Sequence, residues 1–194
     1  MIGIDEVGRG AWAGPLLVVA ARECEHVPDG LKDSKLLTKR QRERLAEGIQ
    51  STCDLGEGWV SPAEVDHLGL TASMRLGVQR ALEKLKARND EEIVIDGHIN
   101  YCAEGYVNAR AVIDADATHP IVSAASIYAK VLRDNYMCEL AKGFPGYGFE
   151  KHVGYGTRTH KEALTQYGVT AIHRKSYKPI QAIPYEQNES SSGA

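Results

Sequence analysis

The sequence has few cysteines, and no two of them stand close together. Its 194 residues include only Cys24, Cys53, Cys102 and Cys138. A zinc ribbon or a redox motif needs two cysteines a few positions apart, so this spacing argues against both. Because structural disulfides belong to oxidising compartments, we expect reduced cysteines and a cytoplasmic protein.

Long apolar runs and a surplus of positive charge are also absent. No run approaches the roughly 20 residues that span a bilayer, and no signal-peptide pattern is visible, so we expect no membrane partner. The formal net charge is −3 and the isoelectric point is about 6.2. A nucleic-acid enzyme with this charge must concentrate its basic residues on the side that meets the substrate.

What is present is typical of a globular α/β protein. Hydrophobic residues make up 43% of the chain and charged residues 25%, which is ordinary for a folded domain. Apolar runs predict strands at 2–7, 16–21, 92–96 and 109–113. Helical spacing and capping residues predict helices at 38–50, 61–68, 71–88, 121–141 and 157–167. This alternation, opened by two successive strands, predicts an α/β layer fold with a mixed sheet.

The composition changes after Lys142, which suggests how the chain is organised. Residues 144–156 are rich in glycine and aromatics, and residues 140–178 carry seven basic side chains against two acidic ones. That segment therefore has a net charge of +5, and the rest of the chain has −8. We expect a catalytic core at 1–141, a small helical substrate-binding segment at 142–180 and a disordered polar tail at 181–194.

Acidic residues stand at the ends of several predicted strands. Asp5 and Glu6 end the first strand, Asp96 ends a later one, and Asp114 and Asp116 follow another. If these carboxylates converge, they repel one another, and a cation removes that repulsion. Oxygen ligands alone suit Mg²⁺ or Mn²⁺. Two such ions can hold the attacking water and the leaving oxygen in phosphodiester hydrolysis.

Each of these acids also has a simpler interpretation. An aspartate at a strand end often caps a turn, and adjacent acidic residues are common on surfaces. Asp5 and Glu6 fit this less well, because they lie between an apolar strand and a glycine-rich loop. The acids by themselves therefore indicate only a generic metal site.

Ordered motifs make the interpretation specific. Residues 4–10 read IDEVGRG, which resembles the DEXGRG signature of ribonuclease HII, the type-2 RNase H family, and Ala13-Gly14-Pro15 also fits. Further similar segments follow in the family's order: DSK at 33–35, IDG at 95–97, AASIYAK at 124–130, FPGYGF at 144–149, KHVGYGT at 151–157 and HRKSY at 173–177. The resemblance covers residues 2 to about 180.

The resemblance implies an RNase H-like mixed five-stranded sheet flanked by helices, with a small helical C-terminal segment. It also implies a catalytic, metal-binding quartet, carried over here as Asp5, Glu6, Asp96 and Asp116. Asp116 is chosen over its neighbour because the family's acid stands ten residues before the serine of the AASIYAK segment. Asp134 lies four residues after a lysine on a predicted helix, where a helical ion pair is expected.

The glycine-rich segment at 8–15, called the glycine loop below, is the first segment expected to recognise the substrate. Gly8 and Gly10 let a backbone approach a ligand closely and allow positive φ. A plain turn would use such glycines too. The resemblance implies that Gly8, Arg9 and Gly10 contact the ribose 2′-hydroxyl, the group that distinguishes RNA from DNA.

Two further binding residues are implied by the resemblance. Tyr155 is expected to stack on the sugar at the RNA–DNA junction, although Tyr147 has a similar glycine setting and remains an alternative. Lys35 is a candidate phosphate ligand, as are the basic residues between 140 and 178. Trp12 and Thr118 depart from the common pattern of the family.

The sequence thus predicts a monomeric, metal-dependent endonuclease acting on RNA–DNA hybrids and on DNA duplexes that contain ribonucleotides. The resemblance implies cleavage 5′ of the ribonucleotide and a role in removing misincorporated ribonucleotides. A related nuclease that cuts only DNA remains an alternative, which the 2′-hydroxyl-reading loop disfavours. A non-catalytic hybrid-binding protein is the other alternative, which the complete acidic quartet disfavours. The C-terminal sequence lacks the paired aromatics of a sliding-clamp peptide.

Overall fold

A mixed five-stranded sheet lies at the centre of the computed structural model, which describes residues 1–23, 28, 30, 31 and 37–183. Its strands are β1 (Ile2–Val7), β2 (Leu16–Arg22), β3 (Asp54–Val60), β4 (Ile93–Asp96) and β5 (Ala109–Val112). In space they follow the order β3-β2-β1-β4-β5. The first three strands are antiparallel, and β4 and β5 continue the sheet parallel to β1. The predicted mixed α/β sheet is confirmed.

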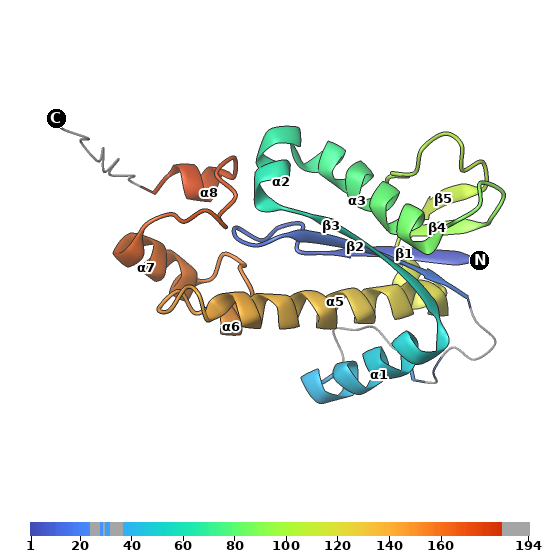
Figure 1. The fold of residues 1–194 in the computed structure, drawn as a ribbon, viewed down its shortest axis with the longest axis horizontal. Coiled ribbons are helices and arrows are strands. Elements are labelled where there is room, and N and C mark those ends of the chain that lie inside the picture. Colours follow the sequence, from blue (N-terminus) through green and yellow to red (C-terminus); the bar gives the residue numbers. More distant parts are fainter. Residues whose placement is uncertain (24–27, 29, 32–36, 184–194) are drawn as a thin grey trace.

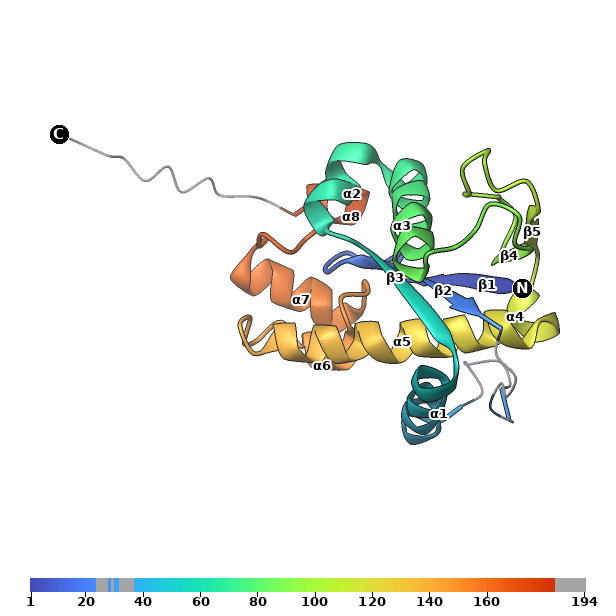
Figure 2. The same cartoon turned by 45° about the vertical axis from the view of Figure 1, so that its right-hand side comes forward.

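Helices cover both faces of this sheet (Figures 1 and 2). α2 (Pro62–Leu68) and α3 (Leu70–Leu85) lie on one face, and α1 (Lys39–Thr52) and α5 (Pro120–Ala141) lie on the other. Side chains of β2 alternate between the two interfaces because successive strand residues point to opposite faces. Leu16, Val18 and Ala20 join the first apolar core, and Leu17, Val19 and Ala21 join the second.

β3 is not among the strands that the sequence predicts, because two glycines weaken its pattern. These glycines let α3 approach the sheet at backbone distance. A Cβ atom on Gly58 would lie 1.8 Å from the carbonyl oxygen of Gly77, and one on Gly56 would lie 2.0 Å from that of Ala81. Glycine in a strand marks such an approach, and here it brings the helix axis close to the sheet.

The predicted starts of three helices agree with the observed caps, whereas the helix predicted over 71–88 ends earlier, at Leu85. Thr38 begins α1 with a capping box in which its hydroxyl accepts from the Gln41 amide. Ser61 forms the same box with Glu64 at the start of α2. Pro120 occupies the first turn of α5, where a missing N–H leaves no hydrogen bond unmade. These local signals fix where the chain enters each helix.

The C-terminal part packs as a third cluster beside one end of the sheet (Figure 1). It contains α6 (Phe149–His152), α7 (Arg158–Tyr167) and α8 (Lys178–Gln181), whereas the four-residue α4 (Ala115–Thr118) belongs to the core. Its apolar cluster also takes Ala13 and Met137 from the core. Most of the predicted tail, 184–194, lies outside the described residues.

The structure also bears on membrane-spanning helices and on cysteine pairing. Among the residues that the structure describes, no helix is both long and apolar enough to cross a bilayer. Cys53, Cys102 and Cys138 are not joined by disulfides, and Cys24 lies outside the described residues.

The glycines of β3 generate a stability prediction. We expect Gly58→Ala to lower the free energy of unfolding by about 1–3 kcal/mol, because the added methyl group collides with the α3 backbone and over-packs the interface. Gly105→Ala is the control, since its Cβ atom would meet nothing closer than the Asn89 side chain at 3.6 Å. Urea unfolding of both variants measures the difference. Equal midpoints would contradict the close-approach argument.

Candidate active site

A cavity of about 360 Å³ lies where β1 and β4 end. Five secondary-structure elements and the loop between α6 and α7 contribute to it. Its lining residues are Asp5, Glu6, Val7, Arg42, Asp96, Asp116, Ser126, Lys130 and Tyr155. The structure therefore brings together all four carboxylates predicted as a quartet, along with the tyrosine predicted as a reader.

Strand pairing explains why two of these acids meet. β1 and β4 are parallel neighbours, with Ile4 opposite Ile95. The next residue of each strand is an aspartate, so Asp5 and Asp96 lie at the same edge of the sheet. The carboxylate of Asp96 also accepts a hydrogen bond from the Ala115 amide at 2.7 Å. This bond attaches the start of α4 to the end of β4.

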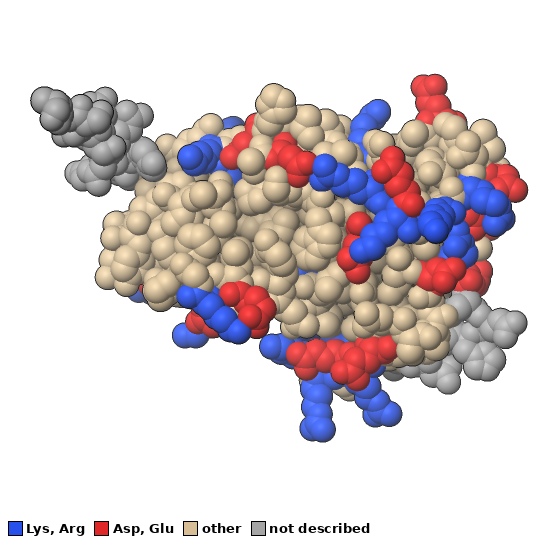
Figure 3. All heavy atoms as spheres, in the orientation of Figure 1, with Lys and Arg blue, Asp and Glu red and all other residues tan. Residues whose placement is uncertain are grey.

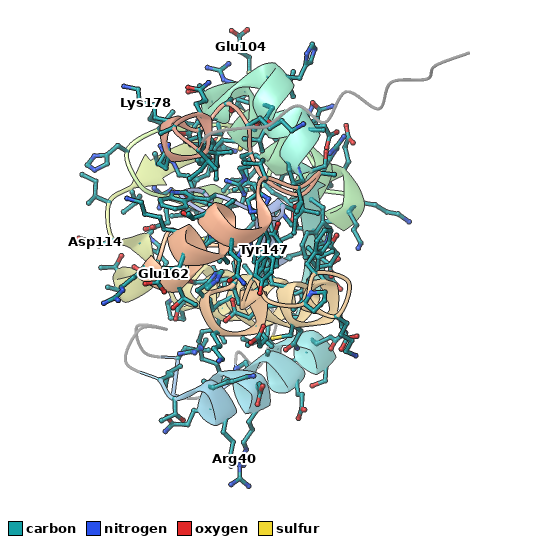
Figure 4. All side chains as sticks on the ribbon, turned by 90° about the vertical axis from the view of Figure 1, so that its left-hand side faces the viewer. Arg40, Glu104, Asp114, Tyr147, Glu162 and Lys178 are labelled. Carbon is teal, nitrogen blue, oxygen red and sulfur yellow. The ribbon has the colours of Figure 1, made fainter. Side chains whose placement is uncertain are left out.

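The bond between Ala115 and Asp96 distinguishes the two candidate acids after β5, Asp114 and Asp116. Asp116 lies on α4 and lines the cavity, as the family's spacing to Ser126 implies. Asp114 is exposed at the edge of the molecule (Figure 4) and precedes the helix with a left-handed φ of 52°. Of the two, only Asp116 is therefore placed to act with Asp5 and Asp96.

The carboxylates are electrostatically costly where they stand. Burial raises the pKa of Asp5 to about 8, and repulsion from Glu6 and Asp96 adds to the effect. Burial also raises the pKa of Glu6, although Arg9, 3.7 Å away, opposes this. Hydrogen bonds from Ser126 and from the Glu6 amide lower the Asp5 pKa only in part. The site holds more negative charge than its neighbours compensate.

The donor set suits a hard divalent cation. Carboxylate oxygens are the ligands that Mg²⁺ and Mn²⁺ prefer. Within the described ranges, however, no three acidic, histidine or cysteine side chains are grouped closely enough to bind one ion together. A cation would both neutralise the carboxylates and draw them together.

The glycine loop and the tyrosine meet beside this cavity. The Gly8 amide donates to the Tyr155 hydroxyl at 3.1 Å, although 147 positions separate them in sequence. Gly8 has a φ of 85°, and a Cβ atom there would lie 2.2 Å from Nε of Arg133. A Cβ atom on the exposed Gly10 would meet nothing within 4 Å, so that side of the loop is open.

Arg133 is a structural residue that the sequence did not reveal. Its side chain is fully buried in α5. The guanidinium donates to the carbonyls of Pro15 at 2.8 Å, Val153 at 2.9 Å and Ala13 at 3.2 Å. It also lies over the Tyr155 ring, 5.6 Å from its centroid. One side chain thus joins the glycine loop to the segment that carries the tyrosine.

Arg174 makes a second connection of this kind, and its interpretation as a phosphate ligand is wrong. The side chain is completely buried. It donates to the Gly14 carbonyl at 3.1 and 3.0 Å and to the Arg9 carbonyl at 3.0 Å. The Tyr177 hydroxyl donates to the same Arg9 carbonyl at 2.6 Å. The guanidinium of Arg174 donates to the glycine loop, so these N–H groups are unavailable to a substrate.

The two tyrosines that the sequence left as alternatives have different surroundings. Tyr147 is only 5% exposed, and it lies inside the C-terminal segment in Figure 4. Its hydroxyl donates to the carbonyls of Tyr167 and Gly168. Tyr155 is partly exposed and lines the cavity. The structure therefore makes Tyr147 a packing residue and leaves Tyr155 as the candidate reader.

Three polar cavity residues were not predicted as part of the site: Arg42, Ser126 and Lys130. Helical spacing was the available signal for two of them, because Ser126 and Lys130 stand four residues apart and share one face of α5. Lys130 also forms the expected ion pair with Asp134, at 2.9 Å. The predicted phosphate ligand Lys35 lies outside the described residues.

Some of the basic charge in the C-terminal segment is balanced locally. Lys142 pairs with Glu139 at 2.5 Å, and Arg158 pairs with Glu162 at 2.7 Å. On the face drawn in Figure 3, the surface over α6–α8 is mostly uncharged, and basic and acidic side chains alternate elsewhere. Within residues 142–178, all of which the structure describes, the exposed basic residues that form no ion pair are Lys151, Lys161, Lys175 and Lys178.

Comparison with known proteins agrees with this architecture. A family model described as Ribonuclease HII matches residues 2–180. A ribonuclease HII from Streptomyces avermitilis is 44% identical over 184 residues, which cover 94% of this chain and 78% of that protein. A chain of the solved PCNA:RNase HII complex from Archaeoglobus fulgidus is 27% identical, with a TM-score of 0.78 and coverage of 96% and 98%. The ribonuclease H2 structure from Pyrococcus horikoshii is 28% identical, with a TM-score of 0.74 and coverage of 94% and 95%.

The raised pKa of Asp5 predicts how stability depends on pH without metal. Between pH 4 and about 8 the folded protein retains a proton that the unfolded chain has released. The free energy of unfolding should therefore fall as pH rises through this window, by at most about 1.4 kcal/mol per pH unit for one group. In urea unfolding with a chelator, Asp5→Asn should flatten this slope, and Mg²⁺ at pH 8 should stabilise the unmutated protein more than the variant.

Asp114→Asn is the matched control for this experiment. The residue is exposed, and asparagine tolerates its left-handed backbone. Its pH slope should equal that of the unmutated protein. If Asp5→Asn keeps the full slope as well, the proposed charge burden on Asp5 is contradicted.

Proposed function

The chain belongs to the ribonuclease HII family, and from that premise we propose that it cuts a DNA duplex on the 5′ side of an embedded ribonucleotide. Members of this family are metal-dependent endoribonucleases that act on RNA–DNA hybrids. The observation that carries the finer proposal is the bond between the Gly8 amide and the Tyr155 hydroxyl, beside a cavity with four carboxylates. It links the two candidate sugar-reading segments at the place where cutting would occur.

We assign the cutting step to Asp5, Glu6, Asp96 and Asp116. Mg²⁺ or Mn²⁺ held by these carboxylates would activate the attacking water and stabilise the charge on the leaving 3′-oxygen, giving 3′-hydroxyl and 5′-phosphate ends. Asp5 and Asp96 are already oriented by backbone amides, those of Glu6 and Ala115, both at 2.7 Å. Such outer hydrogen bonds fix a ligand's direction before the ligand is used.

We assign the choice of cleavage site to Gly8, Arg9, Gly10 and Tyr155. A 2′-hydroxyl can both donate and accept, so backbone groups of an open loop can recognise it. The space beside Gly10 is open, whereas the far side of the loop is closed by buried arginines. Because the Tyr155 hydroxyl accepts from Gly8, its own proton stays available to a second acceptor.

The C-terminal segment carries basic side chains that could contact the phosphates of a duplex. We propose that residues 1–141 cut and that residues 142–180 hold the backbone beside the cut. Exposed Lys151, Lys161, Lys175 and Lys178 are the candidate phosphate contacts in that segment, and Lys35 of the DSK motif is another. Phosphate contacts of this kind position a duplex without reading its sequence. The enzyme would act as a monomer and would remove misincorporated ribonucleotides.

A duplex with one ribonucleotide tests the assignment directly. With Mg²⁺ or Mn²⁺, the unmutated protein should leave a single cut on the 5′ side of the ribonucleotide and should leave an all-DNA duplex intact. Asp5→Asn should lose about a thousandfold in rate, because metal-assisted charge stabilisation is worth several kcal/mol. Gel mapping of the labelled products measures both results. Full cleavage by Asp5→Asn, or equal cutting of all-DNA duplex, would sink the proposal.

The tyrosines provide a matched pair for the reading step. Tyr155→Phe removes the hydrogen bond to Gly8, a net loss of about 1 kcal/mol, so we expect roughly a fivefold lower kcat/KM on the single-ribonucleotide duplex. Tyr147→Phe also loses a hydroxyl, but one bonded inside the C-terminal segment. It should lower the melting temperature and leave site choice unchanged. Identical kinetic effects of the two variants would contradict the role of Tyr155.

A further inference from the structure

Three histidines that the proposed mechanism does not use form a buried chain in the C-terminal segment. His152 and His160 stack with ring centroids 4.6 Å apart. Nε2 of His160 lies 3.1 Å from Nε2 of His173. His160 and His173 are at most 1% exposed. Buried polar rings of this kind must satisfy their nitrogens within the protein.

The contacts at the ends of the chain fix the tautomer of each ring. The Thr170 amide donates to Nδ1 of His173 at 3.0 Å, so that nitrogen carries no proton and Nε2 carries it. Nε2 of His173 therefore donates to Nε2 of His160. The proton of His160 must then be on Nδ1, which lies 3.0 Å from the Tyr155 carbonyl oxygen. The protons thus point along one direction, from Thr170 to Tyr155.

This direction holds only while both rings are neutral. A second proton on His160 would place two donors face to face at 3.1 Å, and a second proton on His173 would place Nδ1–H against the Thr170 amide at 3.0 Å. Burial lowers the pKa of both His160 and His173 to about 4, so near pH 7 the chain keeps one arrangement. The neighbouring rings lower these pKa values further, His152 that of His160, and His160 and His152 that of His173.

The chain ends on the backbone that presents Tyr155. His160 donates to its carbonyl, and the Tyr155 amide donates to the His152 carbonyl at 2.9 Å. The Gly154 amide, one residue earlier, donates to Nδ1 of His152 at 3.3 Å. Within the described part of the chain no three of these nitrogens are grouped to bind a metal. The Nδ1 atoms of His152 and His160 bond to this backbone, whereas Nε2 of His152 lies 2.8 Å from the Tyr147 carbonyl oxygen.

We propose that His160, oriented by His173, is a positioning residue that holds Tyr155 in the orientation needed to recognise the ribonucleotide. The inference rests on the proposed reading role of Tyr155 and deepens it. His160 touches no substrate. It acts through the Tyr155 carbonyl, so its removal should loosen the tyrosine and weaken ribonucleotide binding while the carboxylates stay in place.

Two isosteric substitutions separate the halves of this contact. An asparagine amide reproduces the Nδ1 donor and keeps the bond to Tyr155, whereas a glutamine amide reaches the Nε2 position and keeps the bond to His173. We expect His160→Asn to stay within twofold of the unmutated protein in KM for the single-ribonucleotide duplex. His160→Gln should raise that KM about fivefold with little change in kcat. The same changes at the exposed His67 are the control.

A double-mutant cycle tests whether the effect passes through Tyr155. In a Tyr155→Ala background, His160→Gln should add nothing further to KM. If it adds the same factor there as alone, or if His160→Asn and His160→Gln behave alike, the positioning role is overturned. Melting temperatures identify loss of folding, because a folding defect would lower the melting temperature equally in both backgrounds.

Nitrogen NMR of the unmutated protein provides a measurement that does not require activity. It should show the Nδ1–H tautomer for His160 and the Nε2–H tautomer for His173 at pH 7. Any other pair of tautomers contradicts the hydrogen-bonding order assigned to these histidines. Unmutated protein that cuts no ribonucleotide-bearing duplex overturns the proposed function, and this role with it. Normal cutting combined with an unaffected His160→Gln variant overturns the histidine inference alone.

Discussion

The arrangement of the site depends on two buried guanidiniums that bind backbone carbonyls. Arg133 joins Ala13 and Pro15 to Val153, and Arg174 joins Arg9 to Gly14. A planar group with five donors can satisfy several carbonyls at once, which an ammonium on a flexible stem cannot. These bonds satisfy carbonyl oxygens of the glycine loop, and they add to the packing of Trp12 and Ala13 against the C-terminal cluster.

The sheet fixes the acids in a different way, through topology. The parallel pairing of β1 with β4 brings Asp5 and Asp96 to one edge, and the bond from Asp96 to the Ala115 amide brings α4 and Asp116 along. This geometry accumulates negative charge in a partly buried cavity, and burial raises the Asp5 pKa to about 8. The fold carries that destabilisation because the two apolar cores on either face of the sheet hold the strands in register.

Local patterns were enough to predict most elements, whereas the choice of the four acids, Asp116 over Asp114 included, depended on the family resemblance. Apolar runs and caps such as Thr38 predict helix and strand positions because they act over a few residues. β3 escaped prediction because Gly56 and Gly58 reflect contact with a helix that lies far along the chain. Arg174 was misread for the same reason: a basic residue in a basic segment resembles a phosphate ligand until its distant partner, the Gly14 carbonyl, is known. Long-range contacts of this kind leave no periodic signal.

The carboxylates proposed to cut and the segments proposed to recognise the sugar respond differently to pH and to cations, because different interactions stabilise them. Burial raises the pKa of Asp5 to about 8 and raises the pKa of Glu6, so the charge of these two acids depends on pH and would change with a bound cation. Burial lowers the pKa of Arg133 only to about 10, so it stays charged near neutral pH, and His160 and His173 stay neutral there because burial lowers their pKa values to about 4. The frame around Gly8 and Tyr155 therefore keeps one geometry while the charge of the neighbouring acids varies. A loop shared by both functions can then present the same surface to the sugar whether or not the carboxylates are neutralised.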